Sequence, residues 1–179
     1  LRRRQRKMCI KDSNSILNGD SVLVFVNSRK KTWLISKYIM DRYKRLYNYY
    51  TKNMVGSDKD IMFRDNEKIF DELSNNFYEL VNNEGVYSSL SDRLMKLMKY
   101  GISFHNSSLS DVERKFIEDN FRSKKIKIIV STSTLSAGIN LPANVVIIND
   151  LKVFERDIMR SRYNDVIMIK QMSGRAGRP

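Results

Sequence analysis

Short runs of aliphatic and aromatic residues constrain the fold of this chain more than any other feature. Val22 to Val26, Ile126 to Val130 and Val145 to Ile148 consist almost entirely of Val, Ile, Leu and Phe. Strands buried on both faces have this composition, whereas half-exposed strands alternate apolar and polar residues. Ile102 to Phe104 is a shorter strand candidate. The sequence therefore predicts an α/β fold, a mostly parallel sheet covered by helices on both faces.

Helical periodicity fills the segments between the apolar runs. Residues 32–47 and 167–172 have apolar positions at helical spacing, and Ser110 to Glu113 forms a capping box for a helix that reaches Phe121. Residues 51–100 break the alternation with two helical patterns, 65–81 and 88–100, and we expect residues 54–59 to be a loop. We interpret residues 51–100 as a helical insertion beside the sheet of one domain.

The chain is strongly basic, with 33 Lys and Arg residues against 20 Asp and Glu and a net charge of +13. A polyanionic partner would explain this balance, and a merely solubilising surface is the alternative. The basic residues cluster in residues 2–7, 29–31, 42–45, 124–127 and 156–162.

Cysteine and histidine each occur once, as Cys9 and His105. This count excludes an internal disulfide and a zinc site of the usual kind, and it indicates a reducing compartment. No apolar stretch approaches the length that spans a bilayer. Because the basic start lacks an initiator methionine and a following apolar segment, we expect residues 1–19 to be an interdomain linker or extension within a longer protein.

Polar groups that could bind phosphate follow two of the apolar runs and the predicted helix at residues 167–172. Arg175 and Arg178 are three residues apart among glycines, with Gln171 ahead of them, which suits the binding of a triphosphate or of a nucleic-acid phosphate, or simple ion pairs. Thr132 and Thr134 follow the run 126–130, where open α/β sheets bind ligands, although Thr134 and Ser136 could simply cap a helix. Ser28 and Arg29 follow the run 22–26, either as a phosphate contact or as a solvated helix start.

Four segments, in order, resemble motifs of superfamily 2 helicases of the superkiller-like branch. Residues 131–143 (STSTLSAGINLPA) and 171–179 (QMSGRAGRP) resemble motifs V and VI, and residues 22–31 resemble motif IV. Residues 101–105 with Leu109, Glu113 and Arg114 resemble the branch's element that contains His-His-Ala-Gly-Leu, but Asn106-Ser107-Ser108 replaces His-Ala-Gly. The serine of TLSAG and the KQM lead-in are similar to the subgroup of repair helicases and the polymerase-theta helicase.

This resemblance implies a second RecA-like domain over residues 20–179, including the insertion. It implies that Arg175 and Arg178 reach the γ-phosphate of ATP as arginine fingers and that Gln171 positions the attacking water. Residues near the nucleotide would be Gly138, Asn140 and Gly174. Residues that contact the nucleic-acid strand would be Ser28, Arg29, Thr132, Thr134 and Arg114. Arg114 could instead form a surface pair with Glu118, four residues on.

Two motifs are absent from the sequence, a Gly-x-x-x-x-Gly-Lys-Ser/Thr loop and an Asp-Glu-x-His box. In the family these lie on a first RecA-like domain that holds ATP and Mg²⁺, so we expect this chain alone to be inactive and monomeric. The resemblance implies an intracellular 3′ to 5′ helicase, with DNA repair and the nucleus favoured. The alternatives are an RNA helicase of the same branch or an inactive cassette that binds nucleic acid or protein.

The remaining aromatic and titratable residues suggest mostly structural roles. We expect His105 to be a structural histidine with its hydrogen bonds satisfied and Trp33 to pack in the core. Tyr43, Tyr47, Tyr49 and Tyr50 form a group that could stack on bases.

Overall fold

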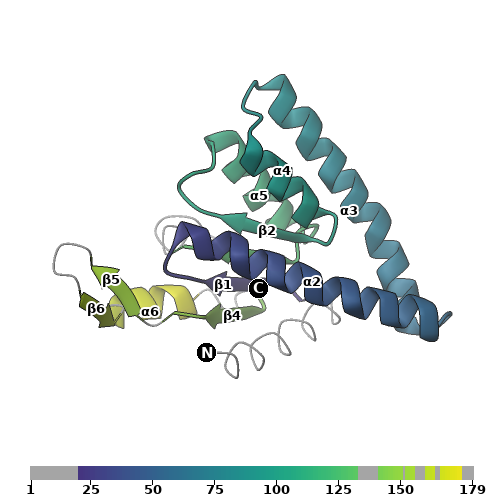
Figure 1. Cartoon of the computed structure of the whole chain (residues 1–179), viewed down its shortest axis with the longest axis horizontal. Helices are drawn as coiled ribbons and strands as arrows, with labels where there is room; N and C mark the ends of the chain where they lie inside the picture. The colour runs from purple at the N-terminus through teal and green to yellow at the C-terminus, as the bar shows by residue number, and fades with distance from the viewer. Residues whose placement is uncertain (1–19, 133–140, 151, 156–159, 164–165, 175–179) are drawn as a thin grey trace.

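The computed structural model describes residues 20–132, 141–150, 152–155, 160–163 and 166–174 (Figure 1). Four strands form its main sheet in the order β2-β3-β1-β4, namely Ile102–His105, Ile128–Ser131, Val22–Phe25 and Val145–Ile148. All three neighbouring pairs are parallel. The four predicted strands and the α/β fold are therefore confirmed.

The strand register brings four strand ends to one edge of the sheet. Val22 pairs with Ile128 and with Val145, and Phe25 pairs with Ser131 and with Ile148. His105 ends β2 beside Ser131 as well. β1, β2 and β3 are buried along their whole length. β4 was also predicted to be buried, but it lies at the edge of the sheet and is only half-buried.

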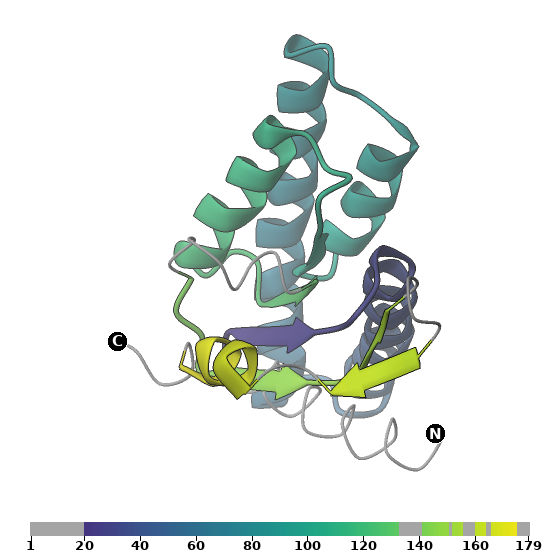
Figure 2. The same cartoon turned by 90° about the vertical axis from the view of Figure 1, so that its left-hand side faces the viewer.

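Helices α2 (Arg29–Asn53) and α5 (Asp111–Arg122) lie on opposite faces of this sheet (Figure 2). Successive side chains of a strand point to opposite faces. Phe104 of β2 makes an edge-on contact with Trp33 of α2, with 6.4 Å between ring centroids, whereas His105 bonds to Glu118 of α5. Trp33 is thus partly buried against the core, as predicted. The predicted capping box of α5 is also present, between Ser110 and Glu113.

The region expected to be a helical insertion contains α3 (Asp58–Asn83) and α4 (Ser89–Met98), which confirms both helical patterns. Their bounds differ from the prediction. α2 continues to Asn53, past the expected end at residue 47, and α3 begins at Asp58 instead of residue 65. The loop between them shortens to residues 54–57, because Ser57 caps α3 by accepting a hydrogen bond from the Asp60 amide.

The tyrosines near the end of α2 explain its length. Tyr43, Tyr47 and Tyr50 all contact the ring of Phe63 on α3, with centroid separations of 5.1, 5.7 and 5.8 Å. Phe63 is buried, so these contacts extend the core beyond the sheet. Three of the four tyrosines expected as a stacking group therefore pack within the protein, and Tyr49 is the exposed member.

α3 and α4 pack beside β2 and α5. Phe70 of α3 lies against the turn that leads into β2, where Gly101 has φ +66°, and a Cβ at Gly101 would lie 2.4 Å from the Phe70 ring. Ser91 of α4 donates a buried hydrogen bond of 2.8 Å to Glu113 of α5. These contacts attach the extra helices firmly to the edge of the sheet.

The segment after β4 contains β5 (Lys152–Glu155) and β6 (Arg160–Tyr163), an antiparallel pair that the sequence analysis did not predict. β6 reads Arg-Ser-Arg-Tyr, which lacks the apolar pattern by which strands are recognised. Helix α6 (Val166–Ser173) follows and confirms the helix predicted for residues 167–172. Within the described residues, no helix combines the length and apolar character needed to cross a bilayer.

Candidate nucleic-acid interface

The four parallel strands deliver polar residues to the carboxyl edge of the sheet. Asn27 and Ser28 follow β1, Asn106 follows β2, Thr132 follows β3, and Asp150 lies just beyond β4. Open α/β sheets bind ligands at this edge, because loops there carry side chains that the buried strands hold in place. We take this edge as the candidate site.

Ser28 and Arg29 lie where the sequence analysis expected a phosphate contact, at the start of α2. Ser28 is the N-cap, and its hydroxyl accepts a hydrogen bond of 3.3 Å from the Lys31 amide. The first turn of α2 contains no acidic residue, and Arg29 and Lys30 are exposed. The positive end of the helix is thus reinforced by two cations, which favours an anion.

The turn after β2 is tied to the first turn of α2 by the residues that depart from the family pattern. Asn106 is buried and donates to the Thr32 hydroxyl over 2.9 Å. Ser108 accepts a hydrogen bond of 2.9 Å from Nη1 of Arg29, and its own amide donates to Asn106. A guanidinium has five donors, so the bond to Ser108 orients Arg29 and leaves other donors for a phosphate.

Asp150 ties the end of β4 to the same helix, a role that the sequence analysis missed. Its carboxylate accepts two bonds of 3.0 and 3.1 Å from the Lys31 ammonium and one of 3.2 Å from the Asn27 amide. The available signal was an Asn-Asp pair directly after an apolar strand. Asp150 offsets the Lys31 charge and holds the start of α2 against β4.

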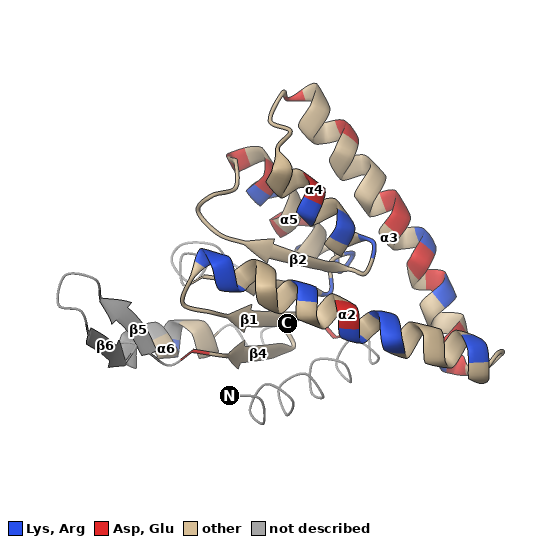
Figure 3. Cartoon of the chain, viewed as in Figure 1, with Lys and Arg blue, Asp and Glu red and all other residues tan. Residues whose placement is uncertain are grey.

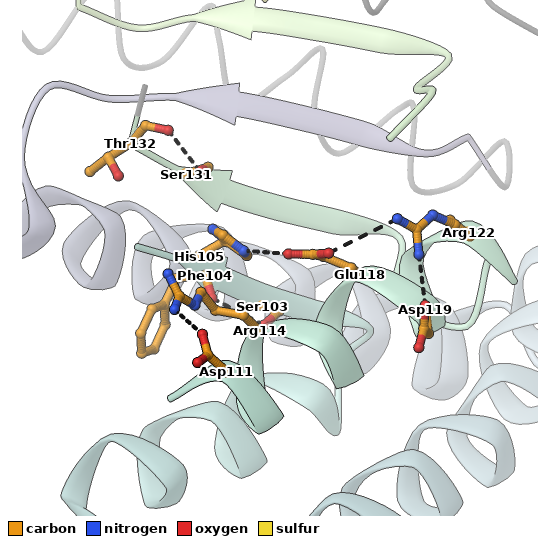
Figure 4. A network of polar contacts seen from close by, with 10 residues as sticks. All are labelled: Ser103, Phe104, His105, Asp111, Arg114, Glu118, Asp119, Arg122, Ser131 and Thr132. Carbon is orange, nitrogen blue, oxygen red and sulfur yellow. Dashed lines mark hydrogen bonds and ion pairs between the residues drawn. The ribbon is translucent and has the colours of Figure 1, made fainter. Parts of the chain in front are cut away.

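Thr132 lies at the end of β3, between the ends of its neighbours (Figure 4). Its amide donates to the His105 carbonyl over 3.2 Å, and its carbonyl accepts a bond of 2.8 Å from the Ser131 hydroxyl. The backbone of Thr132 is therefore fixed, and the residue is at the boundary between buried and partly exposed.

His105 is 2% exposed and bonds through Nε2 to Glu118 over 2.9 Å. Burial lowers the pKa of His105, and the Glu118 carboxylate opposes that shift. His105 is buried, as expected of a structural histidine. Its hydrogen bonds were expected to be satisfied, but only Nε2 has a partner, and within the described residues Nδ1 has none.

Arg114 forms a surface ion pair, but with another acid than the predicted Glu118, and its contact with a nucleic-acid strand stays a prediction. Its guanidinium contacts Asp111, three residues earlier, because Glu118 bonds to His105 and also faces Arg122 at 4.0 Å (Figure 4). The structure thus brings Ser28, Arg29 and Thr132 to one edge, and Arg114 lies in α5, which follows β2.

Several predicted site residues fall outside the described residues, namely Thr134, Gly138, Asn140, Arg175 and Arg178. Gln171 lies on α6. Gly174 follows α6, and its amide donates to the Lys170 carbonyl over 2.8 Å. A Cβ at Gly174 would lie 3.0 Å from that carbonyl oxygen, so a side chain there would be crowded.

A cavity of about 540 Å³ opens elsewhere, in the fork between α2 and α3. Its lining includes Tyr43, Phe63 and Tyr100 together with the charged groups of Lys44 and Glu67. Tyr100 precedes β2, so the cavity lies near the amino ends of the strands. It is separate from the candidate site.

Residues 75–179 match the family described as helicase conserved C-terminal domain. The ATP-dependent DNA helicase Hel308 of Thermoplasma acidophilum is 35% identical over 165 residues, which cover 92% of this chain and 20% of the relative. The Hel308 of Pyrococcus abyssi is 35% identical over 166 residues, 93% of this chain and 20% of the relative.

A third relative is the human U5 small nuclear ribonucleoprotein 200 kDa helicase. It is 33% identical over 160 residues, which cover 89% of this chain and 7% of the relative. The chain thus spans a fifth or less of the length of these curated relatives. Two of these helicases are named for DNA and the third for a ribonucleoprotein, so they do not single out the repair and polymerase-theta subgroup.

Proposed function

This chain belongs to the helicase conserved C-terminal domain family, and we propose that it is the second RecA-like motor domain of an ATP-dependent 3′ to 5′ helicase. In this proposal residues 20–179 form the domain, residues 1–19 join it to a first RecA-like domain, and residues 51–100 form a helical insertion. The first domain holds ATP and its Mg²⁺, and the chain alone does not hydrolyse ATP.

The observation that carries the proposal is the convergence of Ser28, Arg29 and Thr132 at the carboxyl edge of the sheet. Arg29 is exposed and oriented by Ser108, and it stands at the positive end of α2. Hydroxyls, amides and guanidinium groups at such an edge bind phosphates without reading sequence. A motor that moves along a strand needs contacts of this kind, because they must be remade at every base.

The catalytic part of the proposal rests on the helicase motif that starts at Gln171. In ATP hydrolysis, the water oxygen attacks the γ-phosphorus while the bond to the β–γ bridging oxygen breaks. Arg175 and Arg178 would stabilise the charge on the phosphoryl oxygens, and Gln171 would orient the water. Gly138, Asn140 and Gly174 would approach the nucleotide. Arginine fingers contribute on the order of 10³ to 10⁵ in rate.

We propose DNA as the favoured substrate, because the Hel308 relatives are named as DNA helicases. Repair in the nucleus is the setting that the motif resemblance implies. The U5 relative supports the alternative, an RNA helicase of the same branch. An inactive cassette that binds nucleic acid or protein is the other alternative.

The test is an unwinding and ATPase assay of the full-length protein on DNA and RNA duplexes with 3′ overhangs. Arg175→Ala or Arg178→Ala should abolish ATP turnover and largely spare strand affinity. Arg29→Ala should weaken strand binding and make it less sensitive to salt, while ATP turnover at saturating strand stays close to the original rate. Lys68→Ala, an exposed cation on α3, is the control.

Equal loss of turnover and of affinity in the Arg175 variant would contradict the arginine-finger role. Wild-type unwinding of RNA but not DNA would move the proposal to its first alternative. Strand binding without any ATP turnover would move it to the inactive cassette.

A further inference from the structure

One face of α2 is exposed along most of the helix and carries basic and large apolar side chains together. We define the α2 stripe as the six residues Leu34, Tyr38, Arg42, Arg45, Tyr49 and Lys52. They are spaced by three or four positions, and at 100° per residue they fall within about 80° of the helix circumference. The stripe therefore forms one continuous face of α2.

The apolar members of the α2 stripe are unusually exposed for their size. Leu34, Tyr38 and Tyr49 are 50%, 44% and 54% exposed. The other tyrosines of α2 contact Phe63 of α3, whereas Tyr38 and Tyr49 remain largely exposed. Aromatic rings in water next to cations are typical of surfaces on which bases stack.

The cations of the α2 stripe have no acidic partner among the described residues. Arg42, Arg45 and Lys52 are exposed, and the ion pairs of the described residues involve other side chains. The helix contains one acid, Asp41, beside the stripe. A surface that served only for solubility would mix charges of both signs, so the unpaired cations favour a polyanion.

We propose that the α2 stripe binds single-stranded nucleic acid, as an extension of the site at the carboxyl edge of the sheet. This inference rests on the proposed function, because the start of α2 belongs to that site. Leu34 to Lys52 spans about 27 Å at 1.5 Å per residue. This is the length of about eight stacked nucleotides at 3.4 Å each.

The occupant follows from the chemistry of the stripe. Phosphates pair with Arg42, Arg45 and Lys52, and bases stack on Tyr38 and Tyr49 without sequence preference. An acidic protein segment would use the cations as well, but it has no need of exposed tyrosines. Single-stranded nucleic acid uses both.

The test compares oligonucleotides of two lengths on the full-length protein. An oligonucleotide of about 8 nucleotides that occupies the strand-end site is too short to run along the stripe as well, whereas one of about 20 covers both. The double variant Arg42→Gln/Arg45→Gln should weaken binding of the longer one about tenfold at low salt and leave the shorter one unchanged. Its plot of log affinity against log salt for the longer one should be shallower by about 1.4.

Matched variants on the neighbouring helices control for net charge and for loss of an exposed ring. Lys68→Gln/Lys96→Gln removes the same charge from exposed positions of α3 and α4 and should leave both affinities unchanged. Tyr49→Ala should weaken binding of the longer oligonucleotide about fivefold or more. Tyr78→Ala on α3 should have no effect, although Tyr78 is equally exposed and also contacts one other tyrosine.

The outcomes distinguish failure of the proposed function from failure of the stripe proposal. If the wild-type protein binds neither oligonucleotide, the proposed function fails. If it binds both and the stripe variants match it at both lengths, the stripe proposal alone is overturned. If a stripe variant unfolds at a lower temperature than the wild type while its affinities are unchanged, the stripe contacts protein instead, which also overturns this proposal.

Discussion

Helices α2 and α3 are neighbours of nearly equal length, 25 and 26 residues, yet they differ in charge and in what they bury. α2 has eight basic residues and one acid, whereas α3 has three basic residues and seven acids (Figure 3). The net charges are +7 and −4. The net charge of the whole chain therefore hides a division between a basic helix at the candidate site and an acidic helix away from it.

The two helices also differ in the size of the side chains that they bury. α3 buries large side chains along most of its length, among them Phe63, Phe70 and Phe77. α2 buries Ile39, Met40 and Tyr43 and exposes the stripe. We infer that α3 contributes mainly to stability and α2 mainly to binding. Each prediction below tests this difference, from the largest expected effect to the smallest.

Phe77→Ala should have the largest effect. Phe77 is fully buried and contacts Phe116 of α5 with 5.2 Å between ring centroids. Truncation of such a ring costs about 3–5 kcal/mol of unfolding free energy. Urea unfolding of the chain would measure this, with Tyr38→Ala on α2 expected within about 0.5 kcal/mol of the wild type. Equal costs for the two variants would contradict the comparison.

Gly101→Ala should have the next largest effect. It tests the packing of α3 against the turn before β2, because a Cβ at Gly101 would collide with the Phe70 ring. The positive φ costs about 1–2 kcal/mol for alanine, and displacement of the Phe70 ring adds about 1–3 kcal/mol. Gly85 has the same φ of +66° with nothing within 4 Å, so Gly85→Ala should pay only the backbone cost. Indistinguishable unfolding free energies would show that α3 shifts without penalty.

Lowering the pH through 6.5 should act through His105 of β2, since neither α2 nor α3 contains a histidine. The pKa of His105 is below its usual 6.5 in the folded chain. Below pH 6.5 the unfolded chain therefore takes up a proton that the folded chain resists, and stability falls by up to about 1.4 kcal/mol per pH unit. The free energy of unfolding, measured across this pH range, should change less with pH in His105→Gln than in the wild type. A steeper fall in that variant would contradict the assignment.

Tyr47→Phe should have the smallest effect. It removes the hydrogen bond of 2.9 Å from the Tyr47 hydroxyl to Glu67, an exposed link between the two helices, and leaves the contact with Phe63. The expected cost is about 0.5 kcal/mol, with unchanged strand affinity. A cost above about 2 kcal/mol would mean that polar contacts, not packing, join α2 to α3.

β1, β3 and β4 were predicted because each lies in an almost entirely apolar run, a pattern that needs no knowledge of neighbours. The end of α2 was missed because its tyrosines resemble a surface patch until Phe63 of α3 covers three of them. The β5–β6 pair was missed because its sequences, Lys-Val-Phe-Glu and Arg-Ser-Arg-Tyr, show neither an apolar run nor a regular alternation of apolar and polar residues. Ser28, Arg29 and Thr132 could be placed at strand ends from the sequence alone.

The ties between those strand ends could not be predicted. Arg29 meets Ser108 across 79 positions, and Lys31 meets Asp150 across 119. Arg114 was expected near Glu118 by helical spacing, but His105 of β2 occupies that carboxylate. The spacing of residues within one helix cannot show that a side chain from another element binds the same carboxylate.

The sequence by itself determined the four strands of the main sheet, the helicase family and the excess of positive charge, because local composition and short motifs carry that information. The tertiary structure alone decided which side chains are available. Tyr43 and Tyr49 lie six positions apart on one helix, yet the first is buried against α3 and the second faces solvent. Burial depends on what a distant segment places against a residue, and only the folded chain brings that segment there.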